Sequence, residues 1–224
     1  MAILYDLSRF AESGMKAMQC AQRDWSPYLV HFTQALSLQA IQMMFDGKYT
    51  EPERIRQCLA YSDKESYNVA VKIIESGMIK SSLIKGKLNK CVCLSECTLP
   101  GIVGHSERYG RFGFVFKKNT IYKIGGRPCI YVDYDCYKEL RGKKSETERM
   151  KMLWGLANVF CPVGEIQDYT HEREWRIFQD LELKSTLEAV IVPEEYMECI
   201  RKLVHKFLCG TPVVSIDMLY DWGA

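Results

Sequence analysis

Apolar residues near the start of the chain recur mostly at helical spacing. Residues 1–28 carry this pattern, which predicts an amphipathic N-terminal helix. A β-rich run at 28–33 predicts a short strand, and a further helical pattern runs through Met43-Met44-Phe45 until Gly47 ends it. The N-terminal part is therefore expected to be largely helical.

Two capping boxes predict the next helices. They begin at Thr50 and Ser62, and the second helix is expected to end at Gly77. Its predicted buried stripe consists of Tyr67, Ala70, Val71 and Ile74. The lysine-rich stretch from Lys80 to Lys90 then predicts an exposed, flexible connector.

Strand patterns dominate from residue 91 onward, with Gly125-Gly126 as a turn between two of them. Two predicted helices interrupt these strands. One covers 145–160 and starts with a capping box at Ser145, and the other runs from Pro193 to Gly210. The strands are predicted at 91–95, 112–116, 128–133, 175–181, 187–192 and 212–216. Phe112, Phe114 and Phe116 are expected to alternate onto one buried face.

Helices first and strands later favour an α+β fold. At 224 residues, with 47% hydrophobic and 26% charged residues, one domain over 1–224 is expected, with 1–28 as a helical extension and 29–224 as the core. The net charge of +2 gives no bulk attraction to nucleic acid or membrane. No apolar run is long enough to span a membrane, and no secretory leader is visible, so a cytoplasmic protein is predicted.

Ten cysteines in a reducing compartment predict free thiols. Cys91, Cys93 and Cys97, with His105 further on, are the nearest approach to a metal-binding cluster, but they lack Cys-x-x-Cys knuckles. No metal site is therefore predicted. A Gly-x-Ser-x-Gly elbow is also missing, which argues against a serine hydrolase.

The segment His171-Glu172-Arg173-Glu174-Trp175 carries the sharpest chemical signal. On a strand, Glu172 and Glu174 project to the same side, with Arg173 and Trp175 on the other. Adjacent carboxylates repel each other, and such pairs occur where enzymes stabilise a sugar cation and orient a nucleophile. An exposed charged strand, with Arg173 and Arg176 as neighbours, is the alternative.

Three other places carry candidate binding groups. His31 and Thr33 share one face of a strand and can hydrogen-bond sugar hydroxyls, or they merely cap the strand end. Ser95 ends a strand where it can position a ribose or phosphate, or simply start a turn. Tyr109, before Gly110, can stack on a flat ring, or belong to a loop that enters the core.

In chain order, these motifs resemble the AbiGi-like abortive-infection proteins of bacteria, above all over Arg108 to Asp133 and Glu172 to Arg176. More distantly, the chain resembles the ADP-ribosyltransferase superfamily, including the DarT-like toxins. The resemblance covers roughly residues 29 to 192. It implies a split, curved β-sheet core flanked by helices, with NAD as the substrate bound in a cleft.

The resemblance also implies roles for the candidate residues. His31, Thr33 and Ser95 would hold NAD, and Tyr109 would stack on nicotinamide, although Tyr122 and Tyr131 lie near enough in sequence to compete. Glu174 would hydrogen-bond the ribose 2′-hydroxyl, and Glu172 would orient or deprotonate the acceptor. The implied activity is transfer of ADP-ribose to a macromolecule in phage defence or a toxin–antitoxin pair.

Two other functions remain open. The chain is either an enzyme or a non-catalytic antitoxin or sensor module that keeps the fold. A nuclease that binds magnesium through Glu96, Glu172 and Glu174 is a weaker possibility. RNA or DNA is a candidate acceptor, because several basic residues can form a local patch: Lys80, Lys85, Lys87, Lys90, Arg108, Arg111, Lys117, Lys118 and Lys123.

Overall fold

The computed structural model of the chain describes residues 26–33, 51–84, 87–144, 146–160 and 170–220. Within them, eight strands form one mixed sheet: β1 (Tyr28–Phe32), β3 (Ser82–Leu83), β4 (Lys90–Ser95), β5 (Gly113–Lys117), β6 (Arg127–Pro128), β9 (Glu174–Ile177), β11 (Leu187–Val192) and β12 (Val213–Ser215). Their order is β12-β11-β5-β1-β4-β9-β6, with β3 also on β4. Only β11 and β12 run parallel; the other neighbours are antiparallel.

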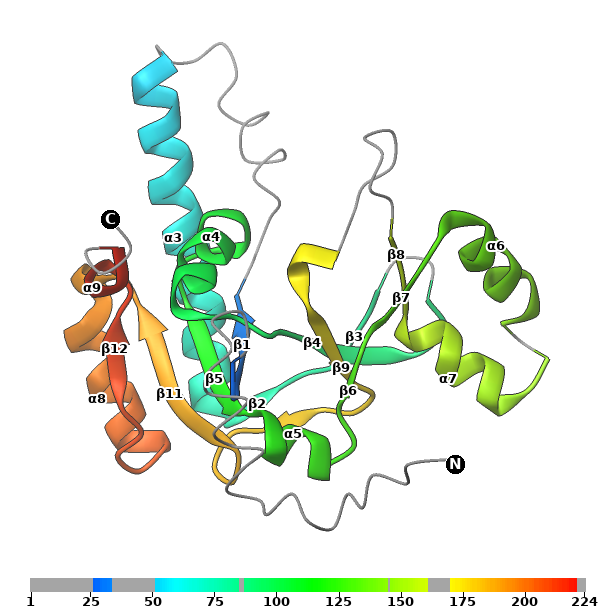
Figure 1. Cartoon of the computed structure of the whole chain (residues 1–224). Coiled ribbons are helices and arrows are strands. Elements are labelled where there is room, and N and C mark those ends of the chain that lie inside the picture. The colour runs from blue at the N-terminus through cyan, green and yellow to red at the C-terminus, as the bar shows by residue number, and fades with distance from the viewer. Residues whose placement is uncertain (1–25, 34–50, 85–86, 145, 161–169, 221–224) are drawn as a thin grey trace, which may run out of the picture.

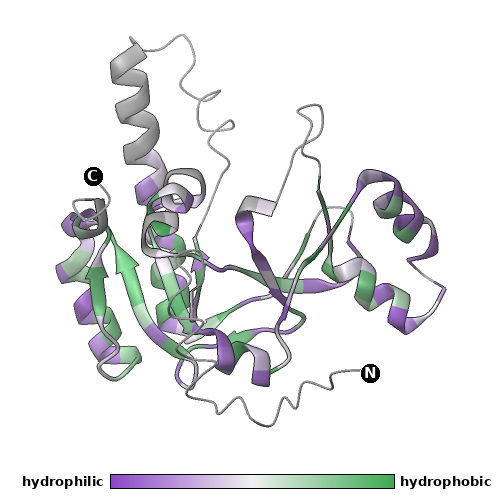
Figure 2. Ribbon diagram, in the orientation of Figure 1, coloured by the Kyte–Doolittle hydropathy of each residue, from purple (hydrophilic) through white to green (hydrophobic). Residues whose placement is uncertain are grey.

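Helices cover both faces of this sheet. On one face lie α3 (Glu51–Ser76) and α8 (Met197–Phe207), whose apolar residues join the main core with Phe112, Phe114 and Phe116. On the other face, α4 (Leu99–Tyr109) contributes Ile102 to a smaller core, and the short α9 (Asp217–Tyr220) packs against α4. Figure 2 shows apolar strands inside and polar residues on the outer sides of the helices.

A lobe projects from one end of the sheet, on the right in Figure 1. It contains β7 (Ile130–Val132), α6 (Tyr134–Lys143), α7 (Glu148–Leu156) and β8 (Ala157–Val159), and β7 pairs with β8 in parallel. We call residues 130–159 the α6–α7 lobe. The remaining elements are short: β2 (Met78–Ile79), α5 (Lys118–Lys123), β10 (Leu181–Glu182) and the 3₁₀ turns η2 (Thr170–Glu172) and η3 (Glu194–Tyr196).

The main sheet is split between β1 and β4. Five residue pairs join β1 to β5, whereas Val30 and Ser95 are the single pair that joins β1 to β4. Beyond this pair the two strands diverge, and side chains rather than a backbone ladder fill the space between them. The predicted α+β class with a split, curved sheet and flanking helices is confirmed.

Several predicted elements are also confirmed. The 187–192 strand is β11, the predicted 28–33 strand is β1, and all three phenylalanines of the β5 region are fully buried. In α3, Ala70 and Ile74 are fully buried and the helix gives way at Gly77, whose φ is +65°. The predicted helices at 1–28 and before Gly47 lie outside the described residues.

Other predictions about the elements were wrong. The two helices expected from boxes at Thr50 and Ser62 are one helix, α3, because helical spacing continues through Ser62. The helix expected over 145–160 is shorter, since Thr147 caps α7 and residues 157–159 form β8. The sequence reading missed α4, α5 and α6 entirely.

The predicted long strands also proved shorter. The strand expected over 128–133 is divided between β6 and β7, and the strand expected over 175–181 is divided between β9 and β10. The lysine-rich connector contains β3, and its Lys87 is buried rather than exposed. Among the described residues, no helix is long and apolar enough to cross a membrane.

Candidate active site

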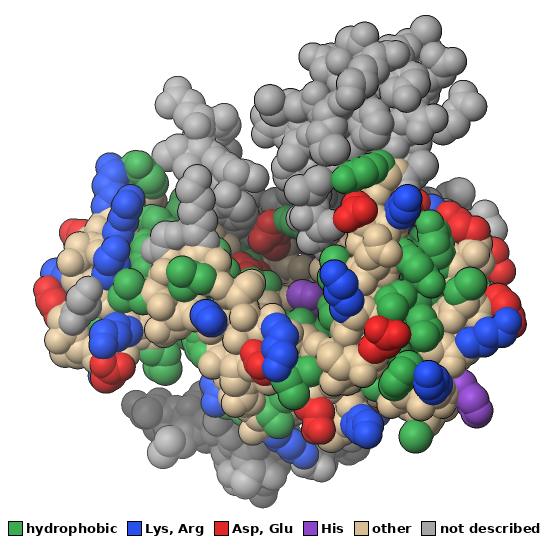
Figure 3. All heavy atoms as spheres, turned by 180° about the vertical axis from the view of Figure 1, so that it is seen from behind, with side chains coloured by type: hydrophobic (Ala, Val, Ile, Leu, Met, Phe, Trp, Pro, Cys, Tyr) green, Lys and Arg blue, Asp and Glu red, His purple; other side chains and the backbone are tan. Residues whose placement is uncertain are grey.

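A cavity of about 490 Å³ lies at the split in the sheet. Its walls come from β1, β4 and β9 on the sheet side, and from Tyr137, Asn158 and Val159 of the α6–α7 lobe on the other. Figure 3 shows that face hollowed near the middle of the molecule, with acidic and histidine side chains visible there. The volume is in the range of pockets that bind small molecules and cofactors.

Glu174 lies on the cavity wall as the first residue of β9. The residue is 6% exposed, and its carboxylate forms a two-point ion pair with Arg176, from Nε to Oε1 at 2.9 Å and from Nη2 to Oε2 at 2.7 Å. Asn158 Nδ2 donates a third hydrogen bond to Oε2 at 3.1 Å. The carboxylate is thus fixed in position, and its charge is matched by one guanidinium.

Arg176 links this carboxylate to the lobe. Its Nη1 donates to the carbonyl oxygens of Gly155, at 2.6 Å, and Ala157, at 3.4 Å, where α7 ends. Burial pushes the pKa of Arg176 down, but the hydrogen bonds and charge of Glu174 push it up further, so the net shift is upward. Arg176 remains a cation, and it holds the lobe and Glu174 together.

Glu172 lines the same cavity but does not lie on a strand. It ends η2, and Arg173 between the two glutamates has a left-handed φ of +41°. The predicted continuous strand was therefore wrong at this point, because the chain turns before β9 begins. The two glutamates nevertheless face one side of the chain, as predicted, because both line the cavity. Arg173 and Trp175 contact Glu96 on the other side.

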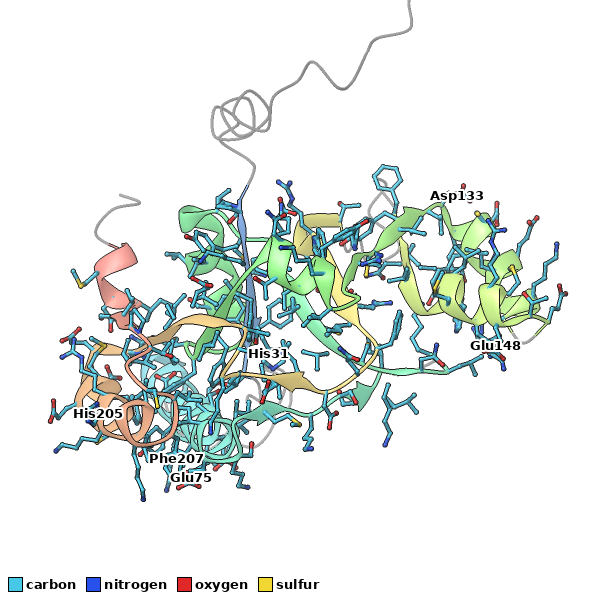
Figure 4. The ribbon with its side chains drawn as sticks, turned by 90° about the horizontal axis from the view of Figure 1, so that it is seen from below. His31, Glu75, Asp133, Glu148, His205 and Phe207 are labelled. Atoms are coloured by element: carbon cyan, nitrogen blue, oxygen red, sulfur yellow. The ribbon has the colours of Figure 1, made fainter. Side chains whose placement is uncertain are left out.

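His31 lies across the cavity from the lobe, in the gap between β1 and β4. Figure 4 shows it near the centre of the molecule, between the α3–α8 end marked by Glu75 and His205 and the lobe marked by Asp133 and Glu148. Its Nδ1 donates to the carbonyl oxygen of Cys93 at 2.8 Å. Burial lowers the pKa of His31 more than this hydrogen bond raises it, so the imidazole is neutral and Nε2 keeps an acceptor lone pair.

Ser95 and Tyr109 also line the cavity. Ser95 pairs in register with Val30 of β1 and with Glu174 of β9, so it marks the point where the three strands meet. Tyr109 ends α4, and its hydroxyl donates to Glu172 Oε1. Its ring stacks on His105 at a centroid distance of 5.8 Å.

Thr33 does not line this cavity. It is 1% exposed, and its hydroxyl donates to the carbonyl oxygen of Ser66 on α3 at 3.2 Å. It borders a second cavity, of about 380 Å³, beside α3, which also touches His31 and Phe32. The two cavities therefore meet at β1.

The competing tyrosines are placed differently. Tyr122 is 54% exposed on α5, beside the guanidinium of Arg127 and away from the cavity. The Tyr131 hydroxyl accepts the backbone N–H of Glu174 at 2.8 Å, which ties β7 to β9. Among the described residues, Tyr109 and Tyr137 are the tyrosines that line the cavity.

Sequence reasoning missed several residues of the wall. Arg176 had a signal, because position i+2 from Glu174 on a strand faces the same side. Asn158 had none, since residue 158 was assigned to a helix, and Tyr137 lay in a segment given no structure. Lys87 was taken for part of an exposed basic stretch, and nothing in its local sequence marks it as buried.

Two predicted functional groupings are not brought together. Four of the nine residues of the predicted basic patch form ion pairs with carboxylates: Lys80 pairs with Asp180, Lys117 with Glu188, Lys118 with Glu96, and Arg111 with Asp63 and Asp217. Glu96, needed for the magnesium hypothesis, is bound by Lys118, Arg173 and Trp175 instead of facing the cavity. The described part of the chain contains no group of three His, Cys, Asp or Glu side chains suited to a metal ion.

Comparison with known proteins gives a fold-level likeness only. No family model matches the chain, and no curated protein matches it significantly. The chain is similar to the solved structure of DarT from Thermus sp. 2.9 in complex with NAD+, with a TM-score of 0.40, 8% identity, and 84% of this chain and 94% of that chain covered. The same DarT in complex with carba-NAD+ gives a TM-score of 0.37 and 10% identity over the same shares. Scores at this level assign no function to the chain.

Proposed function

We propose that the chain is an ADP-ribosyltransferase that uses NAD as its substrate and transfers ADP-ribose to a macromolecule. One observation carries the proposal: His31, Ser95, Tyr109, Glu172 and Glu174, drawn from distant parts of the sequence, line one cavity in the split of the sheet. A neutral imidazole, a hydroxyl, an aromatic ring and two carboxylates are the groups that a nicotinamide riboside needs around it. Residues 29–224 would form the catalytic core as one domain.

The proposed reaction breaks the bond between the ribose C1″ carbon and the nicotinamide nitrogen. Nicotinamide leaves as a neutral molecule, and positive charge develops on the ribose, where the carboxylate of Glu174 stabilises it. As this bond breaks, the nucleophilic atom of the acceptor, or of water in its absence, bonds to C1″, and its proton passes to Glu172. Tyr109 would stack on nicotinamide, with its hydroxyl on Glu172.

Glu174 would accept a hydrogen bond from the ribose 2′-hydroxyl in addition to the hydrogen bonds that it already accepts. A carboxylate has about four lone-pair sites, so Glu174 can accept a further hydrogen bond besides those from Arg176 and Asn158. His31 and Ser95 would hold the ribose from the opposite wall, and Thr33 would support the cofactor from the second cavity.

One observation favours a non-catalytic antitoxin or sensor module instead. The charge of Glu174 is already matched by Arg176, which reduces the field available to a developing cation. A module that keeps the pocket for binding, without bond cleavage, would tolerate this pairing. The two functions differ in a measurable property, the release of nicotinamide.

The first prediction concerns this release. The purified chain is incubated with NAD, and free nicotinamide is measured by chromatography. Glu172→Gln is expected to slow release roughly 10²-fold or more, because the base and the partner of Tyr109 are lost. Glu174→Gln is expected to abolish it, because the stabilising charge is lost.

Controls separate chemistry from folding. Glu188→Gln changes a strand glutamate of β11 that pairs with Lys117, and it should leave release unchanged. Glu174→Gln breaks a buried ion pair and is expected to cost up to about 3 kcal/mol of stability, so its circular dichroism must be native before its activity is compared. Wild-type chain that binds NAD but releases no nicotinamide, either alone or with cellular RNA, DNA and protein added as acceptors, would establish the non-catalytic alternative.

The acceptor and the biological setting extend the proposal. RNA or DNA as acceptor, a partner antitoxin, a role in phage defence and membership of the AbiGi-like family follow from the resemblance of the sequence motifs alone, without support from a basic surface. Mass spectrometry of RNA, DNA and protein from induced cells, searching for added ADP-ribose, tests the acceptor.

A further inference from the structure

Lys87 is the least expected residue of the cavity wall. Lys87 is 8% exposed, and the oxygens that its ammonium contacts in the described residues are neutral. Nζ donates to the carbonyl oxygens of Ala157, at 2.6 Å, and Trp154, at 3.0 Å, and to the Tyr137 hydroxyl at 3.4 Å. Nζ also lies 3.9 Å from the centre of the Trp154 ring.

The charge of Lys87 has no counter-ion in the part of the chain that is described. No carboxylate lies within ion-pair distance of Nζ, and Glu174, the acidic group nearest in the wall, is engaged by Arg176. Burial, and then the positive charge of Arg176, lower the pKa of Lys87 to about 8. A buried cation beside a second cation costs folding free energy, which an incoming anion would offset.

The contact between Lys87 and Tyr137 offers the place for that anion. It is the longest of the three hydrogen bonds of Nζ, and both side chains line the cavity. An anionic oxygen between them accepts an N–H from the ammonium and the O–H from the phenol, while both backbone carbonyls keep their donors. Lysine commonly binds phosphate in this way, as a point charge.

We infer that Lys87 and Tyr137 form an anion site that binds a phosphate group of the ligand. The inference rests on the proposed function for the ligand's class, a dinucleotide whose pyrophosphate lies at the lobe while its ribose lies at Glu174 and His31. The phosphodiester of a nucleic acid has the same chemistry. The small dinucleotide is favoured because Lys87 lies inside a cavity of about 490 Å³ and hardly reaches the surface.

The test is isothermal titration calorimetry with ADP-ribose, which carries the pyrophosphate but has no glycosidic bond to nicotinamide. Titrations of the wild-type chain at pH 8 in two buffers of different ionisation enthalpy measure proton uptake. Lys87 is about half protonated there, so phosphate binding is expected to draw up to roughly half a proton per site. No binding, or binding without proton uptake, would overturn the site.

Variants identify the group that takes up the proton. The ionisable groups around Nζ are Arg176 and Glu174 on β9, Cys91 on β4, Cys129 before β7, and Tyr137 on α6. Lys87→Met should abolish the proton uptake and weaken the binding of ADP-ribose roughly 10- to 100-fold. Cys91→Ala should keep the uptake; if the uptake vanishes there and persists in Lys87→Met, the thiol takes the proton and the proposal fails.

Further controls address the neighbouring groups. Tyr137→Phe should weaken the binding of ADP-ribose several-fold but leave the proton uptake in place, since the ammonium of Lys87 remains. Lys138→Met removes an exposed lysine from the same helix and should change neither quantity. If a short oligonucleotide, but not ADP-ribose, gives Lys87-dependent uptake, the dinucleotide assignment is wrong.

The outcome is independent of nicotinamide release. Proton uptake with ADP-ribose in a chain that never cleaves NAD leaves the anion site standing and removes the transferase. Release of nicotinamide by a chain that shows no Lys87-dependent proton uptake would support the transferase and remove the anion site.

Discussion

At the scale of single residues, Lys87 makes the stability of the fold depend on pH. The unfolded chain keeps the lysine proton up to the ordinary pKa of 10.5, whereas the folded chain releases it near 8. Between these values the unfolded state binds more protons, so this group adds stability as pH rises. Buried thiols act oppositely: burial raises the pKa of Cys97 to about 12, so that thiol subtracts stability as pH rises past 9.

A comparison of wild type with Lys87→Met isolates the lysine, because the thiols contribute equally to both. We expect the free energy of unfolding of wild type, relative to the variant, to rise by roughly 2 to 3 kcal/mol between pH 7 and pH 10. Urea denaturation of both proteins at the two pH values measures it. A difference that stays constant with pH would show that Lys87 does not titrate in this window.

Residue identities in the site were predictable where a local signal operated: strand alternation for the two glutamates, a strand end for Ser95, and the following glycine for Tyr109. Glu172 and Glu174 were expected on one side of the chain, and they line one cavity, although a turn at Arg173 replaces the strand. Arg176 followed from the same alternation and was read only as a neighbouring charge. Lys87 was unpredictable, because its burial depends on carbonyl oxygens of a lobe some 70 residues later in the chain.

At the scale of elements, α4 carries Tyr109 to the cavity and depends on Gly110. Thr98 caps its start, with its hydroxyl accepting the N–H of Gly101, and Gly110 ends it with φ of +99°. These are ordinary start and stop signals with Pro100 in the first turn, so α4 was readable from sequence. It was missed because its apolar stripe is short.

Gly110 is expected to tolerate no side chain. A Cβ there would lie 2.5 Å from the carbonyl oxygen of Thr33 and 2.9 Å from Ser66 Oγ, in a backbone region that L-residues disfavour. Gly110→Ala should lower the free energy of unfolding by about 2 kcal/mol or more, as measured by urea denaturation. It should also slow nicotinamide release, because Tyr109 moves.

Gly104→Ala is the matched control in the same helix. A Cβ at Gly104 meets nothing within 4 Å, so alanine should stabilise α4 by about 0.5 to 1 kcal/mol. Equal changes in the free energy of unfolding for Gly110→Ala and Gly104→Ala would show that the left-handed backbone at Gly110 does not require glycine.

At the scale of the molecule, most strands of the sheet and the helical layer of α3 and α8 followed from the sequence, but α4 and α9 on the other face and most of the lobe did not. Alternating phenylalanines fix β5 at the centre, and the amphipathic α8 was recognised by its spacing. The lobe has few buried residues of its own, and α6 has none in the described set. Periodicity therefore gave no signal for α6, although the α7 region was predicted as a helix. Contacts to Lys87 and Arg176 hold the lobe.

Arg176 is accordingly expected to control the lobe's motion. Arg176→Met removes its hydrogen bonds to Gly155 and Ala157 and leaves Glu174 without its cation, at a cost of about 3 to 5 kcal/mol. Hydrogen exchange followed by mass spectrometry should show faster exchange in α6 and α7 than in α3 and α8. Lys151→Met, which removes an exposed pair on α7, should change exchange little.

Uniformly faster exchange across all helices in Arg176→Met would contradict this view. It would mean that the ion pair stabilises the whole fold and that the lobe has no separate opening reaction.

The divergence of β1 from β4 gives the molecule a seam. Separating most neighbouring strands of this sheet would break a ladder of backbone hydrogen bonds, but beyond Val30 and Ser95 the described residues show the imidazole N–H of His31 bonded to the carbonyl oxygen of Cys93 instead. A ligand that enters beside His31 therefore meets side chains and need not separate any paired strands.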